Sequence, residues 1–425
     1  MEARASALAA LEAILRDRTS LDEALSAARG ETGDARDRAF ARTLVMTALR
    51  RLGQIDAALK PFIAKPLPGK SGPARNILRL GTAELLFLGV APHAAIDSAN
   101  RLAARDRDAR HFKALINAVL RRVAGEGPSI VATQDAPRLN TPDWLWTRWT
   151  AAYGAATARA IAKAHLDEPP LDFSVKADPK HWAEALGARI LPTGTLRRAG
   201  GGRIDDLPGY RDGTWWVQDA AAALPARLLD VKPGETVVDL CAAPGGKTAQ
   251  LVAAGATVTA LDIAPTRLKR LEDNLARLNL TARTLCADAR VWRPETPADA
   301  VLLDAPCSAT GTIRRHPDLP WIKNADNIAE TMPMQRALLD AAVAMVRPGG
   351  RIVYAVCALE PEEGEGQIES LLARSALVRR APISPAELPG LAEALTPAGD
   401  VRLLPSLWPG DGGLDGFFIA RLIRA

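Results

Sequence analysis

The stretch VVDLCAAPGGKT, residues 237–248, decides the fold that this sequence predicts. Its apolar first residues are typical of a buried strand, Gly245 and Gly246 are typical of a tight turn, and a helix is predicted from Lys247 onward. The free N–H groups at the start of such a helix bind ligands. The stretch therefore predicts a cofactor cradle at the end of a strand.

Two common nucleotide-binding motifs do not match this turn. A Walker P-loop needs a glycine five positions before the glycine of Gly-Lys-Thr, and Cys241 stands at that place. The dinucleotide fingerprint Gly-x-Gly-x-x-Gly is also absent. A cofactor without a diphosphate is therefore favoured.

The last two hundred residues alternate between strand-like and helix-like segments. Strands are predicted at 236–240, 257–261, 282–286, 299–304, 350–356 and 417–424. This alternation predicts a doubly wound, Rossmann-like α/β sheet that binds its ligand at the carboxyl ends of the strands.

Two acidic residues follow successive predicted strands. Asp262 ends the second strand about 20 positions after the turn, where an acid holds ribose hydroxyls. Asp288 follows the third strand and is able to accept from an adenine amino group. In this order they describe a pocket for S-adenosylmethionine; the alternative is a pair of solvated loop acids.

Cysteines close the next two predicted strands. Cys307 follows Asp304 in VLLDAPCSATG (301–311), and Cys357 ends the strand in GGRIVYAVCALEPEE (349–363). Adjacent strands of a doubly wound sheet place both thiols and Asp304 on the cofactor's rim. The alternative for either cysteine is an inert core residue. None of the four cysteines forms a C-x-x-C pair and the five histidines are scattered, so no metal site is predicted.

This rim suits methylation of carbon 5 of a cytosine. Carbon 5 is a poor nucleophile until a thiolate adds to carbon 6 of the ring. A nearby acid steadies the ring nitrogen as charge develops, and a base removes the carbon-5 proton. Residue logic alone does not choose between Cys307 and Cys357 as the nucleophile.

Three segments differ in composition. Residues 1–126 read as a helical bundle, with a cap at Ser20, a capping-box partner at Glu23 and a last helix ending at Gly125. Residues 127–215 read as a small α+β module, and 216–425 as the catalytic domain. The first segment holds 21 Lys and Arg against 14 Asp and Glu, which suits an anionic partner such as RNA or marks a solvated helical face.

Composition narrows the class further. Hydrophobic residues make up 48% and charged residues 24% of the 425 residues, as in globular proteins, and no apolar run is long enough to span a membrane. The first twenty residues read as an amphipathic helix, so a cytoplasmic monomer is expected. Trp144, Trp146 and Trp149 are expected to anchor a helix, with base stacking as the alternative.

The motifs resemble a known family. Residues 216–425 resemble the catalytic domain of the NOL/NOP/Sun family of RNA cytosine-5 methyltransferases, through DLCAAPGGKT, LDIAPTRLKRL, CADAR, DAPCSATGT, GGRIVYAVC and GGLDGFFIARL. The N-terminal part resembles the NusB-like RNA-binding domain, through ILRLGTAELLFL, PHAAIDSAN and LINAVLRR. The resemblance implies a class I methyltransferase that uses S-adenosylmethionine on a cytosine of 16S, small-subunit, ribosomal RNA.

The resemblance also implies a role for individual residues. Cys357 is the nucleophile, Cys307 assists product release, and Asp304 contacts the cytosine at the border of the cofactor site. Asp262 holds the ribose, Asp288 the adenine, and Arg267 also binds the cofactor. The cofactor's methionine end and ribose are wrapped by Cys241, Ala242, Ala243, Pro244, Gly245, Gly246 and Lys247.

This chain departs from the family pattern near the nucleophile. Val356 and Ala358 replace the usual Thr and Ser around Cys357, and Gly364 replaces an Asn. Ser174 and Lys176 stand where an Arg and an Asn of the middle module are usual. The rival interpretations are an RNA-binding assembly factor with a weakened core and a methyltransferase acting on transfer RNA.

One basic segment has an open role. His316 is expected either to face a substrate phosphate, together with Arg314 and Arg315, or to cap a loop.

Overall fold

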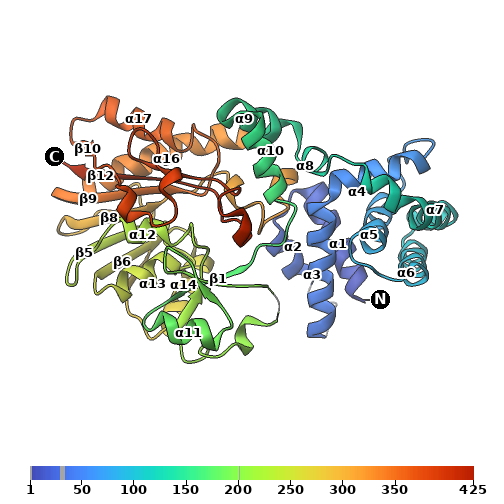
Figure 1. The fold of residues 1–425 in the computed structure, drawn as a ribbon, viewed down its shortest axis with the longest axis horizontal. Coiled ribbons are helices and arrows are strands. Elements are labelled where there is room, and N and C mark those ends of the chain that lie inside the picture. Colours follow the sequence, from blue (N-terminus) through green and yellow to red (C-terminus); the bar gives the residue numbers. More distant parts are fainter. Residues whose placement is uncertain (1, 29–33, 201) are drawn as a thin grey trace. The chain divides into compact units, whose positions relative to one another are not determined.

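The computed structural model describes residues 2–28, 34–200 and 202–425. The chain divides into two compact units (Figure 1). The helical unit comprises Met1–Asp167 and Ile313–Asn324, and the sheet unit comprises Glu168–Thr312 and Ala325–Ala425. No described helix is long and apolar enough to cross a membrane.

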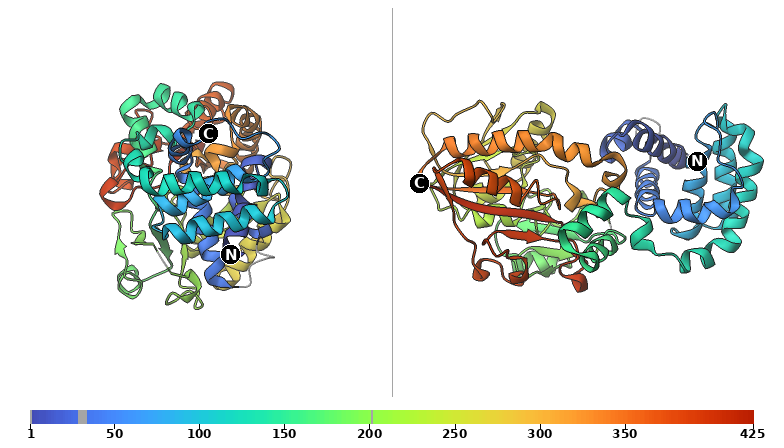
Figure 2. Two further views of the ribbon diagram at one scale, coloured as in Figure 1. Left: turned by 90° about the vertical axis from the view of Figure 1, so that its right-hand side faces the viewer. Right: turned by 90° about the horizontal axis from the view of Figure 1, so that it is seen from above.

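The helical unit packs amphipathic helices around one apolar core. Its helices are α1 (Glu2–Asp17), α2 (Leu21–Ala27), α3 (Ala35–Arg50), α4 (Leu52–Leu59), α5 (Ala74–Leu86), α6 (Pro92–Arg105), α7 (Lys113–Ala132), α8 (Ala136–Leu139), α9 (Asp143–Tyr153), α10 (Ala155–Ala164) and α15 (Leu319–Ile322). Helices α5, α6 and α7 lie side by side (Figures 1 and 2). The predicted cap on α2 is confirmed, since the Ser20 hydroxyl accepts from the Glu23 N–H.

Helix α7 is longer than predicted. It continues past Gly125 and includes Pro128 before it ends at Ala132, so the prediction of an end at Gly125 is wrong. The physical reason is that Gly125 does not adopt the left-handed φ with which a glycine ends a helix. Two residues further on, a Cβ at Gly127 would come within 2.8 Å of Leu86 in α5, so that glycine permits close packing of the two helices.

Residues Ile313–Asn324, called the strap below, pack entirely within the helical unit. The Asp318 carboxylate accepts from the Leu21 N–H at 2.9 Å, and the Trp321 indole donates to the Leu49 carbonyl at 3.0 Å. Arg50 donates to the Arg314 carbonyl at 2.9 Å. Arg314 is 1% exposed, so its guanidinium is not presented to solvent here, and a phosphate contact of His316 stays a prediction.

The three tryptophans of α9 are structural here. Trp149 is buried and meets the His165 ring edge-on, with centroids 5.4 Å apart. Trp144 donates from its indole to the Pro320 carbonyl of the strap at 3.3 Å. Trp146 lies under the guanidinium of Arg138. Helix α9 is thus anchored by these rings, as expected.

The sheet unit is built on a large, mostly parallel sheet in the order β10-β12-β9-β8-β5-β6-β7, with β11 paired to β12. Its strands are β5 (Thr236–Leu240), β6 (Thr257–Asp262), β7 (Arg283–Cys286), β8 (Ala298–Asp304), β9 (Val346–Val356), β10 (Val378–Arg380), β11 (Val401–Leu403) and β12 (Phe417–Arg424). All six predicted strands are confirmed, and so is the Rossmann-like class. The short strands β10 and β11 were not predicted, because three residues carry no readable alternation.

Successive strand residues face opposite layers of helices. The helices of the sheet unit are α11 (Pro179–Ala185), α12 (Leu224–Leu228), α13 (Gly246–Ala253), α14 (Pro265–Arg277), α16 (Ala325–Met345) and α17 (Glu365–Arg374). Val238, Val301 and Ile352 pack with α16 and α17. Val237, Leu302 and Val353 pack with α12 and α13. A strand that is covered on both faces requires the continuous apolar run seen in the sequence.

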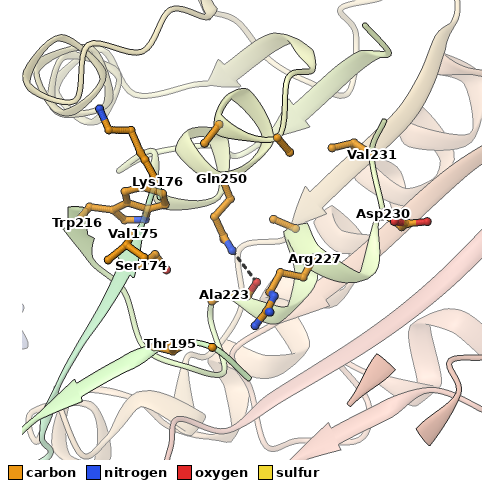
Figure 3. A pocket seen from close by; sticks show the side chains of 14 residues that line it. Ser174, Val175, Lys176, Thr195, Trp216, Ala223, Arg227, Asp230, Val231 and Gln250 are labelled. Atoms are coloured by element: carbon orange, nitrogen blue, oxygen red, sulfur yellow. Dashed lines mark hydrogen bonds between the residues drawn. The ribbon is translucent and has the colours of Figure 1, made fainter. Parts of the chain in front are cut away.

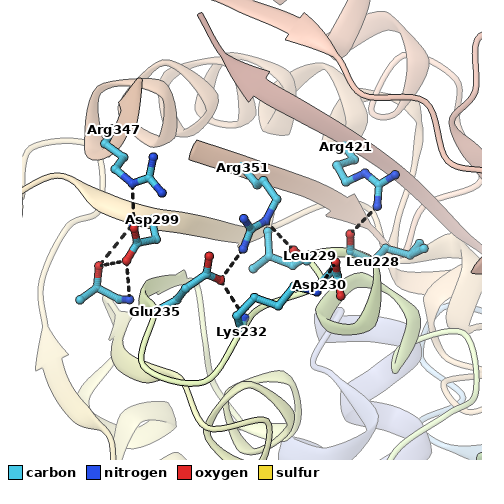
Figure 4. Close-up of polar contacts among 10 residues, drawn as sticks. Leu228, Leu229, Asp230, Lys232, Glu235, Asp299, Arg347, Arg351 and Arg421 are labelled. Carbon is cyan, nitrogen blue, oxygen red and sulfur yellow. Dashed lines mark hydrogen bonds and ion pairs between the residues drawn. The ribbon is translucent and has the colours of Figure 1, made fainter. Parts of the chain in front are cut away.

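Polar contacts fix the amino ends of three central strands (Figure 4). Asp299 of β8 accepts from the N–H and hydroxyl of Thr236 in β5 at 2.8 and 2.9 Å, and from Arg347 of β9 at 2.7 Å. Arg351 pairs with Glu235 on the same edge. The hydrogen bonds from Arg347 and Thr236 lower the pKa of Asp299 to about 2.

A smaller antiparallel sheet precedes the large one. Its order is β2-β3-β1-β4, with β1 (Leu171–Val175), β2 (Arg189–Ile190), β3 (Leu196–Arg198) and β4 (Trp215–Val217). Asp172 of β1 and Arg197 of β3 form a buried bidentate pair at 2.6 and 2.7 Å. Arg197 also donates to the carbonyls of Asp411 and Gly413, so the small sheet is joined to the loop before β12.

We expect Asp172→Ala to lower the free energy of unfolding by about 3–5 kcal/mol, because it leaves the Arg197 charge buried without its partner. Urea unfolding of the full-length protein measures this change. The matched control is Asp273→Ala, which removes an exposed carboxylate paired with Lys269 in α14 and should cost less than about 1 kcal/mol. Equal losses in the two variants would contradict the expectation.

Candidate active site

The register of the parallel strands brings the predicted rim together. Strand β8 pairs with β9 so that Asp304 lies opposite Ala355. The loop after β8 carries Cys307 and the loop after β9 carries Cys357, and their sulfur atoms lie 3.5 Å apart. Both cysteines therefore occupy the same edge of the sheet, as predicted.

The turn after β5 is shaped by its own backbone. Cys241 adopts a left-handed φ of 59°, and Gly245 a φ of 98°, where a Cβ would meet Leu271 at 2.9 Å. Arg267 of α14 donates to the Ala243 carbonyl at 2.8 Å. Burial raises the pKa of Cys241 to about 12, which disfavours its thiolate.

The two predicted cofactor acids lie next to this turn. The Asp262 side chain is 1% exposed, and its carboxylate accepts from the Ala243 N–H at 3.2 Å. The Ala287 N–H donates to the Asp262 carbonyl, which sets the segment carrying Asp288 beside it. Asp288 is more exposed and is paired with Arg290 at 2.6 Å.

Lys247 connects the turn to the cysteines. Its ammonium is 2.7 Å from Asp304 and 5.3 Å from the centre of the Phe417 ring. Burial opposes its charge, but the charge of Asp304, their hydrogen bond and the nearby Cys357 together raise the pKa of Lys247. The structure therefore pairs two residues to which the sequence assigned separate roles.

The chemistry of this set fits a cofactor without phosphate groups. In the described part of the chain, the cations at the turn are already paired: Lys247 with Asp304, Arg267 with Asp262, and Arg290 with its own acid. None of these cations is left to balance the charge of a diphosphate. The carboxylates of the site, in contrast, accept hydrogen bonds from the hydroxyl and amino groups of a nucleoside. The described residues also hold no group of His, Cys, Asp or Glu arranged for a metal ion.

Comparison with known proteins identifies the family. Residues 226–423 match the family model described as 16S rRNA methyltransferase RsmB/F, and residues 1–125 match the NusB family. The chain is 34% identical to the ribosomal RNA small subunit methyltransferase B of Vibrio cholerae serotype O1, over 100% of this chain and 98% of that protein. This chain belongs to the RsmB/F methyltransferase family.

Other relatives support the same assignment. The ribosomal RNA small subunit methyltransferase B of Xylella fastidiosa is 37% identical over 95% of this chain and 94% of its own. The crystal structure of PH0851 matches 99% of this chain and 98% of its own at 26% identity, with a TM-score of 0.76. The predicted family, the NusB-like helical domain and S-adenosylmethionine as cofactor are thereby confirmed.

Two buried acids of this RsmB/F-family methyltransferase were missed by sequence reasoning. Glu360 and Glu363, called the acid pair below, are 1% and 0% exposed. They bond to Ser308, the residue after Cys307. In the sequence, a Pro-Glu-Glu segment is typical of a solvent-exposed loop. Only the hydroxyl side chains of the CSATG segment indicated hydrogen-bonding partners for these acids.

The departures from the family pattern are accommodated by packing. Val356 and Ala358 are fully buried, and the Ala358 carbonyl accepts from Arg402 at 2.6 Å. At Gly364 a Cβ would lie 2.5 Å from the Arg402 guanidinium, so a larger residue at position 364 would require Arg402 to move. No group with an assigned catalytic role is lost.

A separate hollow of about 440 Å³ lies between the small sheet and helices α12 and α13 (Figure 3). Ser174 and Lys176, which replace the usual residues of the middle module, line it together with Arg227 and Gln250. Ser174 donates to Gln218, and Lys176 donates to the Leu278 carbonyl. None of the predicted site residues lines this hollow.

Asp239 of β5 supplies a pH test of the turn. Burial raises its pKa to about 7, although the Thr248 hydroxyl donates to it at 2.6 Å; its second oxygen is buried without a partner in the described residues. Because the folded pKa lies above the unfolded one, its contribution to stability is complete at low pH and is lost as pH rises through about 7.

We expect the free energy of unfolding to fall between pH 6 and pH 8 by about 1 kcal/mol more in the wild type than in Asp239→Asn. Asparagine imitates the protonated carboxyl and does not titrate, so that part of the slope disappears. Denaturant unfolding at several pH values measures it. An unchanged slope would show that Asp239 is already ionised at pH 6.

Proposed function

We propose that this chain methylates carbon 5 of a cytosine in 16S ribosomal RNA through a covalent bond between Cys357 and the base. The observation that carries the proposal is the 3.5 Å contact between Cys307 and Cys357 beside the cofactor turn. The substrate follows from relatives that are named ribosomal RNA small subunit methyltransferase B. We further propose that the protein acts as a cytoplasmic monomer.

The turn and its acids form the proposed cofactor site. S-adenosylmethionine supplies an electrophilic methyl group when bound. Asp262 would hold the ribose, Asp288 the adenine, and Arg267 would keep the turn in shape through the Ala243 carbonyl. The rest of the cofactor would be held by Cys241, Ala242, Ala243, Pro244, Gly245, Gly246 and Lys247, with Asp304 at the border to the base.

The two cysteines take different parts. The hydrogen bond with Cys357, burial and the charge of Glu363 raise the pKa of Cys307 well above its usual value, so Cys307 keeps its proton. Cys357, in contrast, interacts electrostatically with the Lys247 ammonium. This asymmetry supports Cys357 as the nucleophile.

The reaction balances with these groups. The Cys357 thiolate bonds to carbon 6 of a cytosine that has left its stack, and Asp304 contacts the polar edge of the ring. Carbon 5 then takes the methyl group, and S-adenosylhomocysteine is left in the cofactor site. The carbon-5 proton passes to water as the S–C bond breaks, which restores the double bond between carbons 5 and 6 and returns Cys357 as a thiolate, with Cys307 assisting beside the departing sulfur.

We expect Cys307→Ala to accumulate a covalent protein–RNA complex in the presence of S-adenosylmethionine, because release of the product is slowed while attack continues. A denaturing gel with transcribed 16S RNA detects it as a shifted band. Cys357→Ala is the matched control and should give no band. A band in Cys357→Ala alone would exchange the two roles.

In cells we expect deletion of the gene to remove one 5-methylcytosine from 16S RNA, since each such enzyme modifies a defined site. Bisulfite mapping of ribosomal and transfer RNA measures this loss, with complementation by the wild type and by Cys357→Ala as controls. Loss of a 5-methylcytosine from transfer RNA instead would show that transfer RNA is the substrate. No lost site would favour the RNA-binding assembly factor.

A further inference from the structure

The acid pair connects the loops that carry the two cysteines. Glu360 and Glu363 follow Cys357 in the chain, whereas their hydroxyl partners Ser308 and Thr310 follow Cys307. The two loops are also joined through the backbone, where the Gly311 N–H donates to the Cys357 carbonyl at 2.9 Å. The distance between the sulfur atoms is therefore set by these buried contacts.

Glu363 is surrounded by neutral hydrogen-bond donors. Its carboxylate accepts from the Ser308 N–H at 2.9 Å, the Ser308 hydroxyl at 2.5 Å, the Thr331 hydroxyl at 2.8 Å and the Gln335 amide at 2.9 Å. Four neutral donors stabilise a carboxylate anion. In all four contacts the Glu363 carboxylate is the acceptor, so neither of its oxygens acts as a donor.

Glu360 is held differently. One of its oxygens contacts the hydroxyls of Thr310 and Ser308, and the other is buried without a partner in the described residues. A serine hydroxyl has a single hydrogen. The shorter contact assigns that hydrogen to Glu363, so Glu360 must supply the hydrogen between itself and Ser308.

Proton counting therefore gives the acid pair one proton and one negative charge. Burial raises the pKa of Glu360, in agreement with a protonated carboxyl at this position. Two buried carboxyls in contact through one hydroxyl do not both ionise, because the second charge would be desolvated next to the first.

The remaining charges around the cysteines increase the asymmetry. Lys247 faces Cys357 and is paired with Asp304. Tyr354 is buried between the strands and donates to the Glu363 carbonyl at 2.6 Å. Arg402 donates to the Ala358 carbonyl at 2.6 Å, and Glu365 balances its charge. Glu363 thus acts electrostatically on Cys307, and Lys247 acts on Cys357.

We propose that the acid pair determines which cysteine is the nucleophile: its single negative charge keeps Cys307 neutral and so leaves Cys357 as the thiolate. The inference rests on the proposed function, and it makes Glu360 and Glu363 positioning residues that act through Cys307 without touching the substrate. Sequence position and strand order alone do not show which cysteine is the nucleophile, because both sulfur atoms follow equivalent strand ends.

The test is the pH dependence of alkylation of each thiol by iodoacetamide in the full-length protein, quantified separately for Cys307 and Cys357 by peptide mass spectrometry. In the wild type, Cys357 should react at lower pH than Cys307. In Glu363→Gln the reaction of Cys307 at pH 7.5 should rise about tenfold, since its ionisation no longer opposes a neighbouring charge. The exposed neighbour variant Glu362→Gln should match the wild type.

Glu360→Gln tests the proton count independently. A glutamine imitates the protonated carboxyl, so this variant should keep the wild-type profile of both thiols. If Glu363→Gln does not fold, this result alone still decides, because acceleration of Cys307 in Glu360→Gln would overturn the assignment of the charge. An unchanged Cys307 profile in folded Glu363→Gln would overturn the proposal.

Failure of this inference differs visibly from failure of the proposed function. The alkylation profiles are recorded without RNA and without cofactor, so they report the two thiols alone. Absence of a covalent RNA complex in Cys307→Ala would contradict the proposed methylation mechanism. It would not change the expected alkylation profiles of the two thiols. A merely structural role of the acids would lower the thermal stability of Glu363→Gln and leave the order of the thiol profiles unchanged.

Discussion

The parallel register between β8 and β9 is the constraint on which the active site depends. It sets Asp304 opposite Ala355, and every contact between the Cys307 and Cys357 loops follows from that alignment. A shift by one residue would turn the strand side chains to the opposite face of the sheet. The buried apolar residues on both faces of β8 and β9 prevent such a shift, so the core of the sheet holds the sulfur atoms in place.

Electrostatics then distinguishes groups that geometry makes nearly equivalent. Lys247 comes from the turn after β5, Asp304 from the end of β8, and the acid pair from the loop after β9. Each of these charges is held by neighbours that are themselves buried or hydrogen-bonded. The site is therefore preorganised by the strand ends of three neighbouring strands, and little rearrangement of charge is needed when a base arrives.

The sequence predicted those parts that depend on local pattern. Apolar runs located all six long strands, and the rule that parallel strands bind ligands at their carboxyl ends placed Cys307, Cys357 and Asp304 together. The acid pair escaped prediction because its burial depends on Ser308, about fifty residues away in the chain, as hydrogen-bonding partner. The burial of Arg314 escaped for the same reason: the partners of the strap lie far away in sequence.

The strap is a segment of the helical unit that interrupts the sequence of the sheet unit. By its place in the chain it belongs to the sheet unit, since it follows the Cys307 loop; by its contacts it belongs to the helical unit. A recombination event that transferred the sheet unit alone would carry the strap away from Leu21 and Leu49, and the hydrogen bonds of Asp318 and Trp321 would be lost. In this chain, a division that follows the sequence therefore separates contacts that the fold keeps together.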